Sequence, residues 1–298
     1  MNPRLTVLMP VWNGAKHLEE AVRSILVQTE SRFELLIVDD GSTDETPEIL
    51  TKLAAADPRI RVLNSPHQGI VAALNRGIAE SATEWIARMD CDDIAHPERL
   101  ECQLKAVEEN PGAVLCHTQV EYFGDSRFVT RSARMVRSQA LNRLRLCHHC
   151  SISHPTVLYR KSAVLRAGGY LPEDLHVEDF SLWGRLIETG DFVAVTRPLL
   201  KLRLHLESIS KRESRVQMDL SEKIARNHCS RFLKLGERDA ARACSVLRGE
   251  AGQRRFRDWI WFLRHCLPGL SPKSLELRLW ILRRTITRIT LALRAPRH

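Results

Sequence analysis

The sequence EWIARMDCDDIAH at residues 84–96 places a short apolar segment directly before a group of carboxylates. The segment from Trp85 to Met89 is long enough for a buried strand. Like charges packed together destabilise a fold unless a cation or hydrogen bonds compensate, and oxygen-only ligands favour Mg²⁺ or Mn²⁺ over Zn²⁺. The stretch therefore predicts either a metal site or a solvated acidic turn before the helix that starts near Pro97. The three carboxylates are Asp90, Asp92 and Asp93.

Segments that predict strands alternate with segments that predict helices on both sides of this stretch. Amphipathic or small-residue helices are expected after residue 14, after residue 44, at 69–79 and at 97–108. This alternation predicts an α/β fold, a mostly parallel sheet with helices on both faces. The expected strands are 5–9, 33–38, 60–63, 85–89, 113–117 and 192–195.

Polar loops follow three of the expected strands: PVWNG at 10–14, DDGSTD at 39–44 and DCDD at 90–93. Ligands of such sheets bind beyond the carboxyl ends of the strands, so these loops should converge on one crevice. No GxGxxG or GxxxxGK[ST] motif is present, which argues against a dinucleotide site and a P-loop. We expect a cationic partner for the six carboxylates that meet there, Asp39, Asp40, Asp44, Asp90, Asp92 and Asp93.

Four segments, in this order, resemble the N-terminal half of a family 2 glycosyltransferase, and the resemblance covers residues 4–210. It implies the GT-A fold, which is Rossmann-like. It also implies an enzyme that transfers sugars from nucleotide donors and inverts the anomeric configuration. The small bacterial members are more similar than the multi-pass synthases. The four segments are Pro10-Val-Trp-Asn-Gly14, Val38-Asp-Asp-Gly-Ser-Thr-Asp44, Gly69-xxx-Ala-Leu-Asn75-Arg-Gly77 and Arg88-Met-Asp-Cys-Asp-Asp-Ile94.

The resemblance also implies roles for individual residues. Asp39 stands where such enzymes bind the uracil ring of UDP, helped by the backbone of Pro10 and Val11. Asp90 and Asp92 stand in the DxD position, which meets the ribose or sugar and holds Mn or Mg on the diphosphate, and Asp93 lies behind them. The implied donor-binding set is Pro10, Val11, Asn13, Asp39, Asn75, Asp90, Asp92 and Arg203, and the implied metal ligands are Asp92, Asp90 and His205.

Glu178 and Asp179 begin a predicted helix that also contains Trp183. They resemble the Glu-Asp pair of the family, in which the Asp takes the proton of the acceptor hydroxyl. An inverting transfer needs one such general base. Asp179 is therefore the expected base, and Glu178 would orient it or contact the acceptor. Without the resemblance, two acids that favour a helix N-terminus would explain the pair.

Two further segments resemble parts of the family pattern. Ser151 to Arg160 resembles a His-Pro-Ser/Thr strand in which His154 faces the diphosphate or acceptor, although a histidine satisfied in a turn before Pro155 is an equal alternative. Arg203-Leu-His-Leu-Glu-Ser208 resembles a segment that closes over the donor pyrophosphate. Leu202 replaces the Tyr that usually precedes it.

The segment from 121 to 150 breaks the alternation and predicts a loop or insertion. It ends in Cys147-His-His-Cys150, which with His154 is a weak indication of zinc, because no second Cys pair follows. A buried Cys pair at a helix end is the alternative. All eight cysteines are expected to be reduced thiols.

Charge divides the chain at about residue 210. Residues 1–210 carry 24 Lys/Arg against 28 Asp/Glu, whereas residues 211–298 carry 21 against 8. We therefore predict a glycosyltransferase domain at 1–210 and a basic helical region at 211–298, with an anionic partner for the latter. Helices are expected there at 218–235, 239–247 and 256–263.

Residues 275–293 predict a basic amphipathic helix. Trp280 and Ile281 widen its apolar stripe, and arginines fill the positions between. Such a helix can lie on the surface of an anionic membrane. Alternatively, it can pack against protein, either its own neighbours or a second copy in a homo-oligomer. Both interpretations stay open. The apolar stripe is Leu275, Leu279, Leu282, Ile286, Ile289 and Leu293.

The remaining expectations concern the location of the protein, its partners and alternative functions. No secretory signal or apolar run of 18 residues is evident, so we expect a cytoplasmic protein, peripheral on the inner membrane face. The predicted partners are a nucleotide sugar, by default a UDP-sugar, and a glycan, lipid-linked sugar or polysaccharide precursor of the cell envelope. A sugar-phosphate nucleotidyltransferase is disfavoured by the lack of a basic glycine-rich loop. A nucleic-acid-binding protein is disfavoured because no DNA- or RNA-binding motif is present.

Overall fold

The computed structural model describes residues 2–124, 130–131, 138–204, 214–249, 255–266 and 277–285. The chain divides into two compact units. Unit 1 comprises Met1–Met135 and Ile152–Ser214, and unit 2 comprises Val136–Ser151 and Arg215–His298. His205, one of the expected metal ligands, lies outside the described residues.

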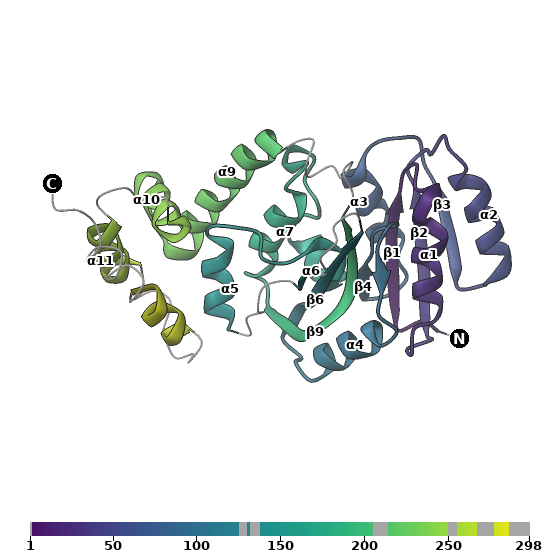
Figure 1. The fold of residues 1–298 in the computed structure, drawn as a ribbon, viewed down its shortest axis with the longest axis horizontal. Helices are drawn as coiled ribbons and strands as arrows, with labels where there is room; N and C mark the ends of the chain where they lie inside the picture. Colours follow the sequence, from purple (N-terminus) through teal and green to yellow (C-terminus); the bar gives the residue numbers. More distant parts are fainter. Residues whose placement is uncertain are drawn as a thin grey trace. The chain divides into compact units, whose positions relative to one another are not determined.

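Unit 1 is built on one mixed sheet with strand order β3-β2-β1-β4-β8-β6-β9-β5, and β7 pairs with β6 (Figure 1). The pairs β1/β2, β2/β3, β1/β4 and β6/β9 are parallel, as expected from the alternating sequence. The strands are β1 (Leu5–Val11), β2 (Phe33–Asp39), β3 (Ile60–Asn64), β4 (Trp85–Arg88), β5 (Ile94–Ala95), β6 (Ala113–Gly124), β7 (Thr130–Arg131), β8 (Leu158–Arg160) and β9 (Asp191–Leu204).

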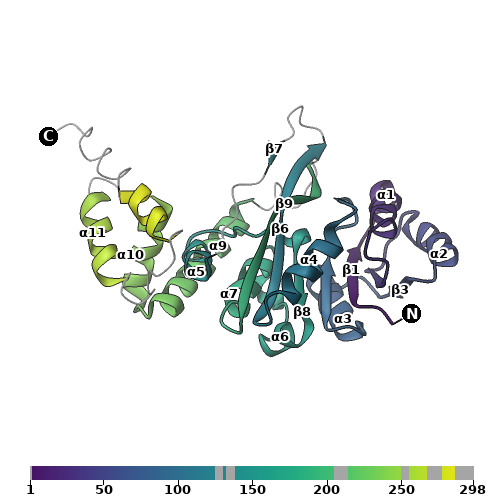
Figure 2. The same ribbon diagram turned by 90° about the horizontal axis from the view of Figure 1, so that it is seen from below.

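Helices cover both faces of the sheet (Figure 2). The side chains of β1 alternate: Leu5, Val7 and Met9 join the core beneath α1 and α4, whereas Leu8 meets α3. A Cβ at Gly77 would lie 2.1 Å from Leu8 Cδ1, so α3 packs against the sheet only because this position is glycine. The helices are α1 (Ala15–Leu26), α2 (Thr46–Ala56), α3 (Ile70–Glu80), α4 (Arg99–Glu108), α6 (Lys161–Arg166) and α7 (Glu178–Leu186), with 3-10 turns η1 (His154–Thr156) and η2 (Pro172–Asp174).

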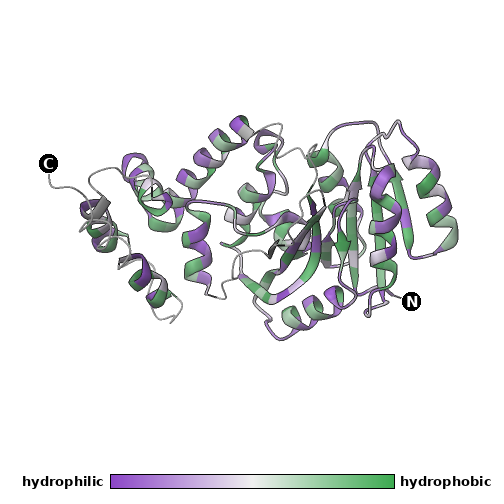
Figure 3. Ribbon diagram, viewed as in Figure 1, coloured by the Kyte–Doolittle hydropathy of each residue, from purple (hydrophilic) through white to green (hydrophobic). Residues whose placement is uncertain are grey.

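The expected α/β architecture is confirmed, and Figure 3 shows hydrophobic residues concentrated on the strands and on the inner side of helices such as α1. The sheet is less parallel than predicted, because β8 lies antiparallel between β4 and β6, and β5 lies antiparallel to β9. Both strands are short, with two residues in β5 and three in β8.

The segment from 121 to 150 differs from the predicted loop. β6 continues to Gly124 and pairs with β9, and α5 (Gln139–Leu146) forms a helix in unit 2. Ser138 caps α5 by accepting a hydrogen bond from Leu141 N. The expected buried Cys pair at the end of this helix is wrong, since Cys147 is buried but Cys150 is exposed.

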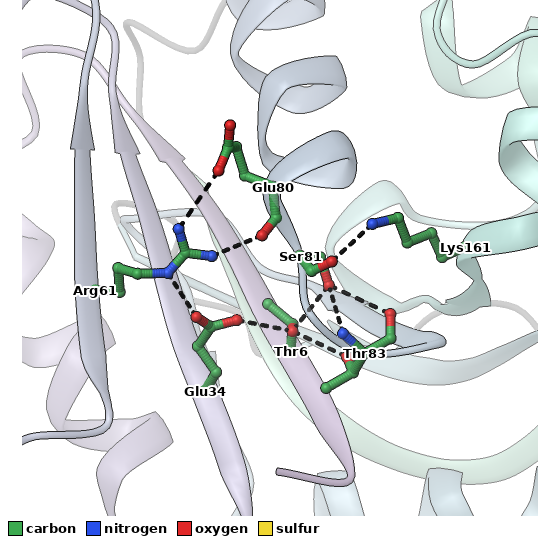
Figure 4. Close-up of polar contacts among 7 residues, drawn as sticks. All are labelled: Thr6, Glu34, Arg61, Glu80, Ser81, Thr83 and Lys161. Atoms are coloured by element: carbon green, nitrogen blue, oxygen red, sulfur yellow. Dashed lines mark hydrogen bonds and ion pairs between the residues drawn. The ribbon is translucent and has the colours of Figure 1, made fainter. Parts of the chain in front are cut away.

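A polar network fixes the amino ends of the strands, away from their carboxyl ends (Figure 4). Glu34 accepts hydrogen bonds from Thr6 Oγ1 at 3.1 Å and from Arg61 Nε at 2.6 Å. Ser81 Oγ donates to Thr6 Oγ1, and Lys161 Nζ donates to Ser81 O at 2.7 Å. These bonds join β1, β2 and β3 to the end of α3 and the start of α6, so this end of the sheet has a structural role.

Unit 2 is helical in its described residues. His228 Nδ1 and Cys229 Sγ bond to the carbonyls of Leu146 and Cys147, which join α9 to the end of α5. Its helices are α5, α9 (Ser214–Leu233), α10 (Glu237–Arg248), α11 (Arg255–His265) and a helical segment at 277–285. None of the helices described for the chain is long and apolar enough to cross a membrane.

The segment 277–285 packs through a different side from the one expected. Trp280 lies 6.1 Å from Trp259 between ring centroids, and Trp259 Nε1 donates to Thr285 Oγ1 at 3.0 Å. Leu279 and Leu282, however, are 44% and 55% exposed. Trp280 therefore belongs to the packed side and does not widen the stripe of leucines.

Candidate active site

The loops after β1 and β2 are bound to each other. Asn13, at φ 51°, donates its backbone N–H to Ser42 Oγ and accepts from Thr43 N through Oδ1 at 2.8 Å. Asp44 accepts from Ala15 N, which satisfies a free N–H at the start of α1. Asn13 and Asp44 thus hold the loops in place.

Asp39 and Asp40 are both buried at the carboxyl end of β2. Asp39, which pairs with Val11 in the sheet, accepts from Ser42 N at 3.0 Å. Asp40 accepts from the backbone N–H groups of Gln68 and Gly69 at 2.9 and 2.8 Å. Backbone hydrogen bonds therefore compensate these carboxylates, and the expectation that all six acids need a cation is too broad.

Trp12 lies in the loop after β1, at the carboxyl edge of the sheet, and is exposed. Its ring is 53% exposed and stacks on His67, with 4.4 Å between the centroids and 20° between the planes. His67 Nδ1 lies 2.9 Å from Asp40 Oδ2. An exposed aromatic face therefore lies in the loop beside the strand end that carries Asp39.

The acidic turn, residues 90–93, follows β4 at the same edge. One ligand atom each of Asp90, Asp92 and Asp93 lies within 4.8 Å of the others, and among the described residues no other group of three or more His, Cys, Asp or Glu meets this criterion. Zinc at Cys147 to Cys150 therefore has no support in the described structure. Asp93 Oδ1 accepts from Arg203 N at 2.8 Å, whereas its buried Oδ2 has no partner among the described residues.

Two buried arginines lie beneath the acidic turn. Arg88 Nη1 is 2.5 Å from Asp90 Oδ2, and Arg99 Nη2 donates to Arg88 O at 2.7 Å. Burial raises the pKa of Asp90, with Arg88 opposing it, and burial together with Asp90 and Asp92 raises the pKa of Asp93 well above its usual range. Burial lowers the pKa of Arg99 to about 10. The negative charge of the turn is only partly compensated, so its donor set fits a divalent cation.

Glu178 and Asp179 begin α7, as predicted. Asp179 Oδ1 accepts from Phe180 N at 2.6 Å. Glu178 is 9% exposed, and its Oε2 has no partner within the described parts of the chain. Burial raises the pKa of Glu178, while the charge of Arg88 opposes that shift.

Residues 6–167 match the sequence model described as "Glycosyl transferase family 2". The chain belongs to this family. An uncharacterized glycosyltransferase of Rickettsia felis is 31% identical over 202 residues, which are 67% of this chain and 33% of that protein. The amylovoran biosynthesis glycosyltransferase AmsE of Erwinia amylovora is 32% identical over 211 residues, which are 70% of this chain and 79% of AmsE. The chain thus spans one third of the first relative and most of the second.

Solved structures show the same fold. S. aureus TarS 1-349 in complex with UDP-GlcNAc has a TM-score of 0.65 at 16% identity, over 97% of this chain and 89% of that one. The mannosyltransferase PcManGT from Pyrobaculum calidifontis, in complex with GDP-Man and Mn²⁺, has a TM-score of 0.56 at 16% identity, over 99% and 88%. The predicted family and the predicted GT-A fold are confirmed.

Arg203 makes several contacts with the acidic turn. Besides its backbone bond to Asp93, it donates Nε to Asp92 O at 2.8 Å and pairs through Nη2 with Glu20 at 2.5 Å. Its guanidinium also lies over the Phe123 ring. These contacts hold the end of β9 against the turn, a role additional to the phosphate contact predicted from the resemblance.

His154 and Asn75 meet at Tyr170. His154 Nε2 lies 2.7 Å from Tyr170 Oη, and the rings of His154 and the fully buried Trp183 form a T-shaped pair with 5.8 Å between their centroids. Burial lowers the pKa of His154 well below its usual value, so the ring is neutral. The histidine satisfied before Pro155, one of the two alternatives from the sequence, matches this arrangement. Asn75 bonds to both the N–H and the C=O of Tyr170.

No sequence pattern predicted a role for Arg88, Arg99 or Tyr170, although all three contact residues of the candidate site or of its supporting shell. Arg88 had a visible signal, because a charged residue in an apolar strand must find a partner. Arg99 and Tyr170 lie in segments whose partners only the tertiary structure reveals. Of the predicted residues, Asp39, Asp90, Asp92, Asp93 and Arg203 lie with Asn13 on the loops and strand ends described above.

Proposed function

We propose that the protein is an inverting glycosyltransferase that moves a sugar from a nucleoside-diphosphate donor, in the first place a UDP-sugar, to a hydroxyl acceptor with the help of Mn or Mg. The observation that carries this proposal is the acidic turn at the carboxyl edge of the sheet, with Asp39 on a neighbouring strand end of that edge. The proposal is supported by the neighbours TarS and PcManGT, which bind UDP-GlcNAc and GDP-Man.

The donor would bind along this edge. Asp39 and the backbone of Pro10 and Val11 would receive the base, and the exposed face of Trp12 offers a stacking surface beside them. Asp90 and Asp92 would hold the metal, with Asp93 behind them and His205 as a further ligand. A divalent cation held there would stabilise the negative charge that develops on the leaving nucleoside diphosphate. Asn13, Asn75 and Arg203 would support the donor through the loops that they fix.

The acceptor would be activated from α7. Asp179 takes the proton of the acceptor hydroxyl as its oxygen bonds to the anomeric carbon, and the bond to the nucleoside diphosphate breaks on the opposite face. One displacement of this kind inverts the anomeric configuration. The hydrogen bond from Phe180 N to Asp179 Oδ1 orients the base, and the buried Glu178 contacts the acceptor or orients Asp179. His154 would support Glu178 and Asp179 indirectly, by packing against Trp183 of the same helix, α7.

A screen of nucleotide sugars tests the proposal. Purified protein is heated with UDP-, GDP- and other nucleotide sugars, each with Mn²⁺, with Mg²⁺ and with EDTA. A bound donor stabilises the fold in proportion to its occupancy, so one nucleotide class should raise the melting temperature only when metal is present. No shift with any nucleotide sugar in the presence of metal contradicts the proposal.

We also propose that residues 1–210 form the catalytic domain and residues 211–298 a basic region that meets a membrane, on the cytoplasmic face and peripherally. Within 277–285, the exposed positions Arg278, Leu279, Leu282 and Arg283 recur at a spacing that places them on one helix face. Leucines between arginines suit an anionic lipid surface. The name of AmsE supports an acceptor in polysaccharide synthesis, such as a lipid-linked sugar or another glycan.

Vesicle flotation tests the membrane contact. The wild type should float with vesicles that contain anionic lipid and not with neutral ones. The double variant Leu279→Gln, Leu282→Gln should stay unbound, because both side chains are exposed and their loss leaves the packing intact. Equal flotation of the two proteins contradicts the contact. A change in oligomeric state in light scattering would instead assign this face to a second copy of the chain.

A further inference from the structure

The glycine turn, residues 167–169, ends α6 and begins the segment that leads to α7. Gly168 and Gly169 have φ angles of 87° and 66°, in the left-handed region that often ends a helix. Gly169 N donates to Val164 O and Gly168 N to Leu165 O, each at 3.0 Å. The backbone therefore closes α6 in a fixed shape and leaves the carbonyl groups of the turn as acceptors.

Arg185, on α7, binds the glycine turn through both terminal nitrogens of its guanidinium. Nη1 donates to Ala167 O, and Nη2 donates to Gly169 O at 2.9 Å. The end of α6 carries partial negative charge, so a cation is favourable there. Two bonds from one planar group fix its orientation as well as its distance. They therefore fasten α7 to the turn at a defined rotation about the helix axis.

The rotation of α7 decides where the side chains of its first turn point. Arg185 follows Glu178 by seven residues, close to two helical turns, so the two side chains leave the same face about 10 Å apart along the axis. Asp179 lies about 100° further around the helix. Glu178 is buried and Asp179 is half-buried, so the Asp179 carboxylate stands at the border of the buried face. A fixed Arg185 therefore fixes the direction of Asp179.

The glycine turn is itself bound to α3, on the donor side of the site. Tyr170 follows the turn directly, and its backbone N–H and C=O both bond to the Asn75 side chain. A Cβ at Gly169 would lie 2.8 Å from Asn75 Oδ1, so this close approach needs a glycine. His154 bonds to Tyr170 Oη and packs against Trp183 of α7. Direct contacts thus connect α3 to α7 through the turn.

The geometry points to Arg185 as a positioning residue that sets the rotation of α7 and, through it, the direction of the Asp179 carboxylate. This inference rests on the proposed function, in which Asp179 is the base. Both terminal nitrogens of Arg185 bond to backbone carbonyls, so Arg185 acts on the reaction through the helix that carries it. A lysine would keep the positive charge, but it is a compact point charge without the fork and would leave α7 freer to rotate.

The test compares Arg185→Lys in the wild type and in the Asp179→Asn background. Hydrolysis of the nucleotide sugar that the thermal screen selects is followed with radiolabelled donor at high enzyme concentration, with water in place of the acceptor. Arg185→Lys should lower kcat by about 10- to 100-fold, as for a misplaced group, and leave the affinity for Mn²⁺ with UDP within about twofold. In the Asp179→Asn background, Arg185→Lys should change kcat by less than about threefold, because the group that it positions is gone.

Arg160→Lys is the matched control. Arg160 also bonds to two backbone carbonyls, through Nε to Ala113 O and through Nη2 to Pro111 O, each at 3.2 Å. It pairs in the sheet with Trp85, the first residue of β4, and so lies at the amino edge. Arg160→Lys should therefore turn over as the wild type does.

The outcomes separate the inference from the proposed function. A folded Arg185→Lys enzyme with unchanged kcat overturns the inference, and so does an equal loss in the two backgrounds. If Arg185→Lys does not fold, Tyr170→Phe takes its place, since it removes only the hydroxyl that meets His154. Unchanged kcat or an equal loss in both backgrounds then overturns the inference. A wild type that neither binds nor hydrolyses any nucleotide sugar with Mn²⁺ overturns the proposed function itself.

Discussion

Asn75 on α3 bonds to both backbone groups of Tyr170, which lies 95 residues later. Asn75 Nδ2 donates to Tyr170 O at 2.8 Å, and Asn75 Oδ1 accepts from Tyr170 N at 3.0 Å. Tyr170 in turn lies 2.7 Å from His154 through its hydroxyl. A residue that the resemblance assigns to the donor therefore also fixes the segment that leads to Glu178 and Asp179.

Asn75→Ala should destabilise the protein by roughly 2–4 kcal/mol, because it leaves two backbone groups of a buried residue unpaired. Urea unfolding measures this change. Asn110→Ala is the control, since the Asn110 amide caps an exposed helix end and its loss should cost below about 1 kcal/mol. Unchanged stability together with a raised donor KM would show that the Asn75 amide serves the donor and not Tyr170.

The sequence predicted the sheet and its edge because apolar periodicity and loop chemistry are local. Strands at 5–9, 33–38 and 60–63 lie within β1, β2 and β3, and the acidic turn follows β4 as expected. The antiparallel placement of β8 was not predictable, because it depends on the tertiary pairing of Leu158–Arg160 with both β4 and β6. The grouping of residues 136–151 with 215–298 also depends on tertiary contacts, such as that of His228 with Leu146 O.

The site shows the same division. Motif spacing located Asp90, Asp92 and the Glu178–Asp179 pair, but it could not show which side chains are already engaged. Asp40 is bound to the backbone of the 67–69 loop, and Arg203 is bound to the acidic turn and Glu20. Such partners lie 28 to 183 residues away, beyond any local pattern.

Asp92→Ala should weaken binding of Mn²⁺ with UDP by at least about 100-fold, since even the outer partners of metal ligands contribute 10- to 100-fold. Titration calorimetry of UDP with and without Mn²⁺ measures the loss. Asp57→Asn is the control, because Asp57 pairs with Arg59 beyond the end of α2 and should bind as the wild type does. Unchanged metal-dependent affinity in Asp92→Ala contradicts the role of Asp92.

Asp179→Asn should lower kcat by about 10²- to 10⁴-fold, the usual contribution of a general base, while UDP and Mn²⁺ still bind. The Asn side chain can keep the hydrogen bond from Phe180 N, so the loss reports the missing base and not a displaced side chain. Glu173→Gln tests the specificity of the effect, as Glu173 is exposed in η2 and should be silent. Turnover near that of the wild type in Asp179→Asn removes Asp179 as the base.

Glu178 gives the fold a measurable pH dependence. Burial raises its pKa above the ordinary value, with Arg88 opposing, so the folded protein binds this proton more tightly than the unfolded chain. The stability that this protonation contributes is fully present below the ordinary pKa of about 4.3 and is lost as the pH rises through the raised pKa.

Glu178→Gln removes this titration. The difference in melting temperature, variant minus wild type, should therefore increase as the pH rises from about 4.5 to 8, even though the turnover of the variant is lower. Differential scanning calorimetry across this range measures the difference, with Glu173→Gln as the flat reference. A difference for Glu178→Gln that does not change with pH would mean that Glu178 titrates normally in the folded protein.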